Sequence, residues 1–241
     1  MTENSNSDWK TAFRSFYYQT MEEPPPVVLP QAQTALLVID IQACYLPENP
    51  PDDANELPEW DRWAPFRARM RETVVPNTQK LLAAFRAREM DVFFARIACL
   101  NAQGRDRSLS QARPGFNDLL LPKDEADSQI YQGVAPRENE IVVLKTTDSA
   151  LTGTNLRLIL SNMGVKNVVV CGIFTDQCVS STVRSLADES FNVVVIHDAC
   201  AAATMELHDA ELTVINNIYC QVLGVDEVLQ VLKGVGAARS G

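Results

Sequence analysis

Three side chains that can take part in nucleophilic chemistry stand at the ends of apolar runs in this 241-residue sequence. Asp40 and Lys145 each directly follow a short apolar run, and Cys178 follows another run by a short turn. A thiol becomes a nucleophile when a base or a positive charge helps it to lose its proton. Taken singly, the aspartate could be a turn residue, the lysine a solvated side chain and the cysteine a small buried apolar residue.

The setting of Cys178 favours reactivity. The preceding residues Thr175, Asp176 and Gln177 are typical of a helix start. The backbone N–H groups and the dipole of a helix N-terminus lower the pKa of a nearby thiol, and a neighbouring ammonium group lowers it further. We therefore expect a lowered Cys178 pKa if Lys145 lies beside it.

The elements that position these residues follow from hydrophobic periodicity. Short apolar runs predict five strands buried on both faces, at residues 35–39, 92–97, 141–144, 167–173 and 192–196. Helical patterns lie between or after them, from 76 to 85, from 155 to 163 before Gly164, from about 178, and from 206 to 217. This alternation predicts a single doubly wound α/β domain over residues 34–235, with a mostly parallel sheet and helices on both faces. Residues 1–33 are expected to form an N-terminal arm, lying on this domain or on another subunit.

In an open parallel sheet, ligands bind beyond the carboxyl ends of the strands. Asp40, Lys145 and Cys178 should therefore meet at that edge, although they lie far apart in the sequence. Residues 45–65 break the strand–helix rhythm with five prolines, which we interpret as irregular chain. This segment is either a surface loop held by Trp60 and Trp63 or a lid beside the active site.

Composition narrows the class of protein. The net charge of −10 argues against nucleic acid or an anionic membrane as the main partner. No apolar run approaches the roughly 20 residues of a membrane span, and the N-terminus lacks signal-peptide character. Six cysteines without a Cys-x-x-Cys pair indicate a reduced, cytoplasmic protein. With only two histidines, His197 and His208, both interpreted as structural, no metal or other cofactor is expected.

Three segments resemble the isochorismatase-like cysteine hydrolases, particularly the branch of N-carbamoylsarcosine, biuret and ureidoacrylate hydrolases. They read LVIDIQ at 37–42, KTTDSALTGT at 145–154 and VCGIFTDQCV at 170–179. The segments occur in the family's order and spacing, and the similarity runs from about residue 34 to 224. Leu151 replaces an aromatic residue of the family pattern.

The resemblance implies a catalytic triad of Asp40, Lys145 and Cys178. Asp40 would take the thiol proton, Lys145 would stabilise both anions, and the Cys178 thiolate would attack an amide or ureido carbonyl. The backbone N–H groups of Phe174 and Cys178 would hold the oxyanion. The resemblance also implies a cis peptide bond between Ile173 and Phe174. A thioester would then be hydrolysed with water activated by Asp40.

Departures from the family pattern narrow the expected chemistry. The histidines of the nicotinamidase metal site are missing, since no histidine precedes His197. The isochorismatases proper cleave a vinyl ether and lack the nucleophilic cysteine. The resemblance therefore implies hydrolysis of a small linear amide or ureido compound. Phe174 should crowd the pocket, which favours a small or flat substrate.

Other candidate residues carry more than one interpretation. Gln42 could bind substrate, hold Lys145 or anchor a loop; Arg96 could bind a substrate carboxylate or pair with an acid. Thr175 could touch substrate or cap a helix. Substrate contacts should come from the 45–75 and 98–135 loops. Hydrolysis of an ether or ester, and a non-catalytic binding or redox-sensing role, stay open as alternatives. The arm and an apolar stripe from 214 to 223 suggest a homodimer or homotetramer.

Overall fold

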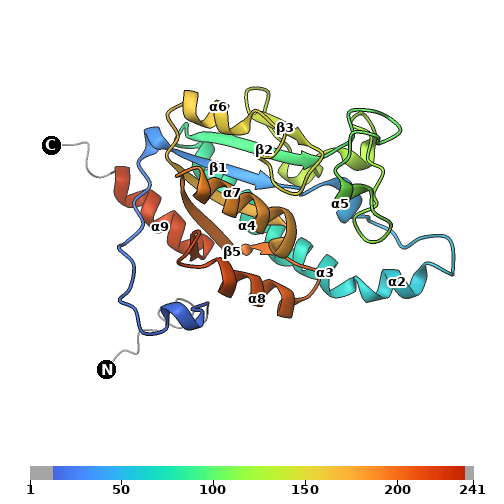
Figure 1. The fold of residues 1–241 in the computed structure, drawn as a ribbon, viewed down its shortest axis with the longest axis horizontal. Helices are drawn as coiled ribbons and strands as arrows, with labels where there is room; N and C mark the ends of the chain where they lie inside the picture. The colour runs from blue at the N-terminus through green and yellow to red at the C-terminus, as the bar shows by residue number, and fades with distance from the viewer. Residues whose placement is uncertain (1–12, 237–241) are drawn as a thin grey trace.

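Six parallel strands form the centre of the molecule, in the order β3-β2-β1-β4-β5-β6 (Figure 1). The computed structural model describes residues 13–236. The strands are β1 (Thr34–Ile39), β2 (Asp91–Ile97), β3 (Ile141–Lys145), β4 (Asn167–Ile173), β5 (Asn192–Ala201) and β6 (Gln221–Leu223). Every residue of β1 and β4 is buried, because helices cover both faces of these central strands. Their apolar runs are therefore continuous instead of alternating.

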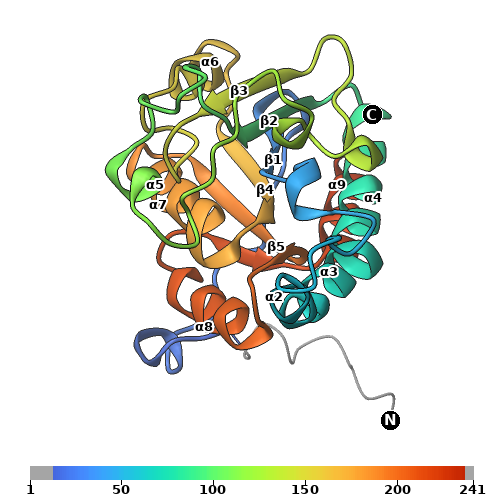
Figure 2. The same cartoon turned by 90° about the vertical axis from the view of Figure 1, so that its right-hand side faces the viewer.

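Helices lie on both faces of the sheet, which confirms the predicted doubly wound α/β fold (Figure 2). One face carries α4 (Val75–Arg86) and α9 (Val225–Gly236), and the other carries α6 (Leu156–Asn162), α7 (Ser180–Asp188) and α8 (Met205–Ile215). Gly164 follows α6 with a φ of 75°, in the left-handed region that ends helices. Thr204 caps α8 through its hydroxyl, which accepts a hydrogen bond from the Leu207 amide at 3.3 Å.

The expectation of irregular chain over residues 45–65 is wrong in its second half. Two short helices, α2 (Leu57–Arg62) and α3 (Ala64–Arg69), lie there and continue through a π-helical turn into α4. Pro58 and Pro65 occupy the first turns of α2 and α3, where no intrahelical N–H bond is lost. The prolines therefore start these helices instead of preventing them.

The last two strands also differ from the sequence expectation. Strand β5 extends to Ala201, so His197 and Asp198 lie inside this strand and not after the predicted strand of residues 192–196. The stripe at 214–223 contains β6, a strand of only 3 residues that adds to the sheet edge beside β5. So short a strand gives almost no periodic signal. Among residues 13–236, no helix is long and apolar enough to cross a membrane.

The predicted arm is described only from residue 13 onward, and residues 1–12 lie outside the described part. From Phe13 the chain runs along its own domain: the Phe13 carbonyl accepts a hydrogen bond from Asn216 at 2.9 Å. Further on, the Pro25 carbonyl accepts one from Gln221 at 3.4 Å, and Leu29 is buried.

Close packing of β1 against β4 sets the geometry of the carboxyl edge. Ile39 pairs with Gly172, whose φ is 124°. A Cβ atom on Gly172 would lie 2.0 Å from the Ile39 carbonyl oxygen, so only glycine fits this position without displacement. Asp40 follows directly with a φ of 51°, which turns the chain at the strand end. On the other side of β1, Ile97 of β2 pairs with Lys145 of β3.

Candidate active site

Asp40, Lys145 and Cys178 converge at the carboxyl edge of the sheet, as the topology predicts. The Lys145 Nζ lies 2.7 Å from Asp40 Oδ2 and 3.3 Å from Cys178 Sγ, and it also donates to the Thr147 carbonyl at 3.2 Å. The three residues are almost fully buried, with 2%, 1% and 4% of their surface exposed, respectively. An ammonium group therefore sits between a carboxylate and a thiol, away from bulk water.

The protonation of this cluster differs from the sequence expectation. Burial and the negative charge of Asp40 raise the pKa of Cys178 well above its usual value, and the opposing effect of Lys145 does not offset them. Burial also raises the pKa of Asp40, against the lowering effect of Lys145. For Lys145, burial favours the neutral form, but the charges of Asp40 and Cys178 outweigh it and the pKa rises. The resting cysteine is thus a thiol, and the expectation of a lowered Cys178 pKa is wrong because desolvation dominates.

The chain before Cys178 forms a π-helical turn, Thr175–Val179, which leads into α7. The Phe174 carbonyl accepts hydrogen bonds from the amides of Gln177 at 3.0 Å and Val179 at 3.1 Å. The Ile173–Phe174 peptide bond is cis, at the position where the family resemblance implies one. Single π-helical turns of this kind often mark functional sites.

Gln42 and Arg96 lie beside the cluster but turn toward the protein. The Gln42 amide group donates to the carbonyls of Ile97 at 2.9 Å and Ser128 at 2.8 Å, and its oxygen accepts from the Ile97 amide. The Arg96 guanidinium donates to the Ser128 carbonyl at 2.8 Å and the Lys123 carbonyl at 2.9 Å. Both side chains anchor the loop around residues 123–128. The contacts of Gln42 match its interpretation as a loop anchor. Those of Arg96 match neither a substrate-binding residue nor a partner of an acid, because its guanidinium donates to backbone carbonyls.

Thr175 also faces the interior. Its hydroxyl lies 2.7 Å from His208 Nδ1, and His208 Nε2 lies 3.0 Å from a guanidinium nitrogen of Arg69. Because a guanidinium only donates, Nε2 of His208 must accept, which places the ring proton on Nδ1 facing Thr175. Burial, and then the charge of Arg69, lower the pKa of His208 to about 3. His208 is a neutral structural residue that ties α8 to the turn carrying Cys178.

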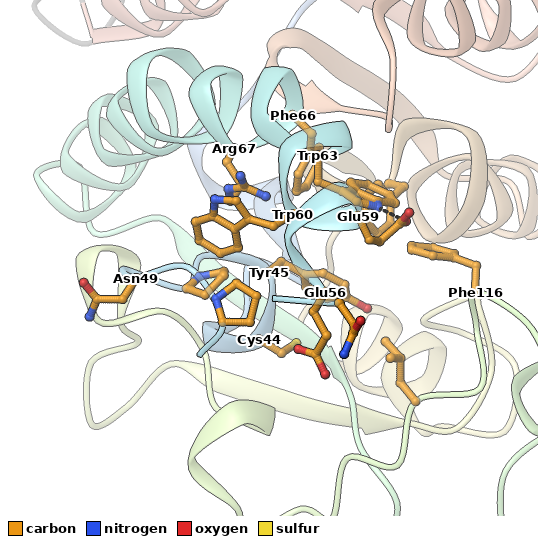
Figure 3. Close-up of a pocket in the computed structure, with 15 residues that line it drawn as sticks. Cys44, Tyr45, Asn49, Glu56, Glu59, Trp60, Trp63, Phe66, Arg67 and Phe116 are labelled. Carbon is orange, nitrogen blue, oxygen red and sulfur yellow. Dashed lines mark hydrogen bonds between the residues drawn. The ribbon is translucent and has the colours of Figure 1, made fainter. Parts of the chain in front are cut away.

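An aromatic pocket of about 720 Å³ adjoins the turn of Cys178 through Phe174, and Figure 3 shows the residues that line it. Tyr45 and Phe174 connect this pocket to the cluster of Asp40, Lys145 and Cys178. The charges of Cys178 and Asp40 act on the Tyr45 hydroxyl and, together with burial as the main cause, raise its pKa well above the usual value. The Phe174 ring packs against four others: Tyr45 at 5.3 Å, Trp63 at 6.0 Å, Phe66 at 5.1 Å and Phe116 at 5.4 Å between centroids. The remaining lining includes Cys44, Glu56, Glu59, Trp60 and Arg67.

These lining residues come from the two loop regions expected to supply substrate contacts. Residues 44–67 follow β1, and Phe116 and Leu119 follow α5 (Leu109–Ala112). The sequence reasoning left the functions of Trp60 and Trp63 open; both line the pocket, and α2 carries Trp60 into it. The lid interpretation of this segment agrees with that position better than a remote surface loop does.

Two further residues near the thiol were not identified from the sequence. Asp148 Oδ1 lies 3.9 Å from Cys178 Sγ, and Gln111 of α5 donates to the same oxygen at 2.5 Å. Asp148 lies within the quoted segment 145–154, so its proximity to Lys145 was the available signal. No sequence signal pointed to Gln111, because only the fold brings α5 to this edge of the sheet. Among residues 13–236, no group of three or more His, Cys, Asp or Glu side chains is arranged to hold a metal ion.

Comparison with known proteins places this geometry in a family. The chain is 31% identical over 206 residues to an uncharacterized isochorismatase family protein, YecD, of Escherichia coli O157:H7, covering 84% of this chain and 96% of that protein. It is 29% identical over 178 residues to an N-carbamoylsarcosine amidase of Arthrobacter sp., covering 70% and 64%, respectively. A cysteine hydrolase from Pseudomonas syringae pv. phaseolicola 1448A shares the fold, with a TM-score of 0.74, 22% identity, and coverage of 89% of this chain and 100% of that one.

The family model for the isochorismatase domain matches residues 34–227, which include β1 through the start of α9 and all three residues of the buried cluster. These matches span most of the chain and agree with the resemblance seen in its three motifs. The protein is therefore a hydrolase of the isochorismatase family.

Proposed function

We propose that this protein hydrolyses a C–N bond of a linear amide or ureido compound through a Cys178 thioester, without a metal ion. The observation that carries the proposal is the buried Lys145 ammonium, which lies within 3.3 Å of Sγ and 2.7 Å of Asp40. These three groups supply a nucleophile, a base and a fixed positive charge in one desolvated site. A purely structural cysteine needs none of this arrangement.

The first half-reaction begins from the neutral thiol. As Sγ bonds to the carbonyl carbon, the thiol proton passes to Asp40 and the carbonyl oxygen becomes an oxyanion. The amides of Phe174 and Cys178 would donate to this oxygen. Asp40 then returns the proton to the nitrogen, the C–N bond breaks, and ammonia or an amine leaves. The raised pKa of Asp40 suits this shuttle, because a carboxyl must hold the proton briefly.

The second half-reaction uses water. Asp40 takes a proton from a water molecule as its oxygen attacks the thioester carbon. The C–S bond then breaks, the acid product forms, and Cys178 regains a proton from Asp40. Lys145 stays positively charged throughout, because its pKa is raised by both neighbouring groups. Its charge stabilises whichever neighbour is anionic at each stage.

The relationship to an N-carbamoylsarcosine amidase supports a ureido or amide substrate. A redox-sensing role fits the site less well. Sensor cysteines are accessible and have a low pKa, whereas Cys178 is buried and its pKa is raised.

The test is ammonia release from biuret, N-carbamoyl amino acids, ureidoacrylate, maleamate, nicotinamide and aliphatic and aryl amides, measured in EDTA. Wild-type protein should turn over at least one class, while Cys178→Ala should be inactive and retain the wild-type circular dichroism spectrum. Removal of a catalytic nucleophile commonly lowers kcat by about 10⁴-fold or more. Turnover by Cys178→Ala at the wild-type rate would refute the thioester mechanism, and turnover that EDTA abolishes would refute its independence from metal.

A further inference from the structure

One charged side chain in the aromatic pocket has no part in the triad chemistry. Arg67 of α3 lines the pocket and is only 7% exposed. Its guanidinium lies flat over the Trp60 ring, with Cζ 3.5 Å from the ring centroid (Figure 3). Stacking on an aromatic face leaves the N–H groups at the guanidinium edge available for a hydrogen-bond acceptor.

The neighbouring arginines all have acceptors. Arg62 pairs with Glu59 at 3.1 Å, Arg69 donates to the carbonyls of Cys200 and His197, and Arg71 donates to the Pro47 carbonyl. In contrast, the Arg67 guanidinium makes no hydrogen bond or ion pair within residues 13–236; it stacks on Trp60, and Asp61 and Arg71 act on it only through their charges. The Arg67 side chain has little exposed surface and no protein acceptor, so its N–H groups depend on the water that still reaches them for hydrogen bonds. A ligand carboxylate can replace that water with charge-assisted hydrogen bonds.

The carboxylates of the pocket do not serve as this acceptor. Glu59 accepts from Trp63 Nε1 at 2.7 Å and from Arg62, and both Glu56 and Glu59 are exposed. Both carboxylates therefore face water, and Glu59 already has its own partners. Within residues 13–236, Arg67 is the one cationic side chain that lines the pocket.

Apolar surface lies between Arg67 and the triad. Phe174 adjoins the turn that carries Cys178, and its ring packs 5.1 Å from that of Phe66, the residue before Arg67. Trp63 lies between Phe66 and the stacked ring of Phe116, at 5.4 Å and 5.3 Å. This wall suits a planar or aliphatic group. The volume of about 720 Å³ also exceeds what a small or flat compound alone would fill.

We propose that the pocket recognises substrates that carry a carboxylate at the far end of an apolar or aromatic spacer, and that Arg67 binds this carboxylate. The spacer would pack on the rings of Phe174, Phe66 and Trp63, and the scissile amide or ureido carbonyl would reach Cys178. The substrate class is then a monoamide or N-carbamoyl derivative of an apolar carboxylic acid. This inference rests on the proposed amidohydrolase function for the reacting end, but the carboxylate site itself does not require catalysis.

Binding is tested first, with inactive full-length Cys178→Ala and the tryptophan fluorescence of Trp60 and Trp63. The probes are 4-phenylbutanoate and the uncharged 4-phenylbutan-1-ol, which share the spacer. A charge-assisted pair with a buried guanidinium should make the acid bind about tenfold more tightly than the alcohol. Adding Arg67→Met should remove this preference, and Arg67→Lys should restore only part of it, since lysine lacks the planar fork.

Arg62→Met serves as the matched control, because it removes a positive charge from the same stretch of chain but from a side chain outside the pocket lining. The acid should keep its advantage in this variant. Equal binding of acid and alcohol to the protein with Arg67 intact would overturn the proposal, even if Arg67→Met failed to fold. An equal loss of preference in Arg62→Met and Arg67→Met would overturn it too, since general charge would then explain the effect.

Turnover separates this proposal from the amidohydrolase function. Wild-type protein should release ammonia from the monoamide of 1,4-phenylenediacetic acid with a lower KM than from 4-methylphenylacetamide, and Arg67→Met should raise the first KM about tenfold with little change in kcat. Turnover of both amides with equal KM would overturn the carboxylate site and leave the amidohydrolase function standing. Tight, Arg67-dependent binding of the acid with no turnover of any amide would support the site and overturn the proposed function.

Discussion

The position of Lys145 between Asp40 and Cys178 determines how these residues share one proton and one positive charge. An isolated buried ammonium would lose its proton, and an isolated buried carboxylate would gain one. Together they form an ion pair of 2.7 Å that is buried on all sides, next to a thiol whose pKa is raised. In the proposed mechanism, such a site holds the Cys178 thiol in its neutral form and activates it only as the proton moves to Asp40.

Alkylation of Cys178 as a function of pH should report these charges. Burial and the charge of Asp40 raise the thiol pKa while Lys145 lowers it. Asp40→Asn should therefore move the alkylation profile to lower pH, and Lys145→Met should move it to higher pH. Iodoacetamide labelling of Cys178, followed by mass spectrometry of its peptide, measures both profiles. Shifts in the same direction for both variants would contradict the assigned charges.

The activities of the same two variants should both fall, by about 10²-fold or more, although their thiol pKa values move in opposite directions. The reason is that Asp40 must carry the proton between sulfur and nitrogen, a step that a more acidic thiol does not replace. Lys145→Met also leaves Asp40 without its partner, which typically costs about 3–5 kcal/mol of stability. Urea unfolding therefore accompanies the ammonia assay. Full activity in Asp40→Asn would exclude its role as the base.

His208 gives a pH-dependent contribution to stability. Its pKa is about 3 in the folded protein, against 6.5 as the ordinary value, so the unfolded chain binds a proton first as the pH falls. This contribution to stability is complete above about pH 6.5 and declines by up to about 1.4 kcal/mol per pH unit as the pH falls toward 3. His208→Asn should lack this slope in urea unfolding at pH 7, 6, 5 and 4. Asp40, with its raised pKa, contributes the opposite sign in both proteins, so its contribution cancels in the difference between them.

At the scale of elements, the contact between β1 and β4 places Asp40 and the Cys178 turn at the same edge. Ile39, the last residue of β1, pairs with Gly172, the second-to-last residue of β4, so both chains leave the sheet toward the site just after this pair. Gly172 lets the two backbones approach, and Asp40 turns away at a positive φ. The relative position of Asp40 and Cys178 therefore depends on the absent side chain of Gly172 as much as on these two residues.

Gly172→Ala should damage both stability and activity. The added Cβ would meet the Ile39 carbonyl oxygen at 2.0 Å, so β1 or β4 must shift and carry Asp40 with it. Gly164→Ala is the control: its φ of 75° is also positive, but a Cβ there meets open space. The control should lose about 1 kcal/mol in urea unfolding and keep wild-type kcat. Gly172→Ala should lose about 3 kcal/mol, at the upper end of the range typical of overpacked cores. Equal losses in the two variants would show that backbone strain alone matters.

The sequence was sufficient to predict β1 to β5, their parallel arrangement and the meeting of Asp40, Lys145 and Cys178, but not β6. Buried strands leave continuous apolar runs, and parallel strands bring their carboxyl ends together, so these features follow from local pattern and one topological rule. Gln42 and Arg96 could not be assigned in this way, because their partners lie in the loop around residue 128 and no periodic pattern predicts its path. The expectation of a lowered Cys178 pKa was wrong for a similar reason. Burial raises this pKa, and the burial of Cys178 depends on how the surrounding loops fold.

The sequence predicted which loop regions supply the pocket, but the shape of the pocket could not be predicted, for the same physical reason. Its walls come from two short helices that begin with proline and from the irregular segment around Phe116. Helices of 6 residues carry little periodic signal, and their direction is set by packing on Phe174. Arg67 is recognisable as a ligand-binding residue only once its burial and its stack on Trp60 are known.

At the scale of the whole molecule, α8 has two unlike faces. Its inner face carries His208, which ties it to the turn of Cys178. Its outer face exposes Leu207 and Val214, two helical turns apart, and Ile218 follows beyond the helix end. The arm passes nearby, since Asn216 just after α8 binds the Phe13 carbonyl, and both views show the arm beside α8 (Figures 1 and 2). Exposed apolar side chains gathered in this way favour association.

We propose that two copies of the chain associate through this outer face of α8, because a two-fold axis pairs an apolar helix face with itself. Sedimentation velocity at micromolar concentration should show a dimer or a tetramer of such dimers. Leu207→Glu should reduce the assembly, since it would place two carboxylates in an apolar contact without partners. Leu158→Glu is the control, because Leu158 is also an exposed leucine (57%, against 46% for Leu207) and lies on α6, which Figure 1 places far from α8. A monomeric wild-type protein, or equal dissociation by both variants, would exclude α8 as the interface. If the interface is correct, Leu207→Glu should also lower ammonia release more than Leu158→Glu does, because the inner face of α8 holds Thr175 through His208.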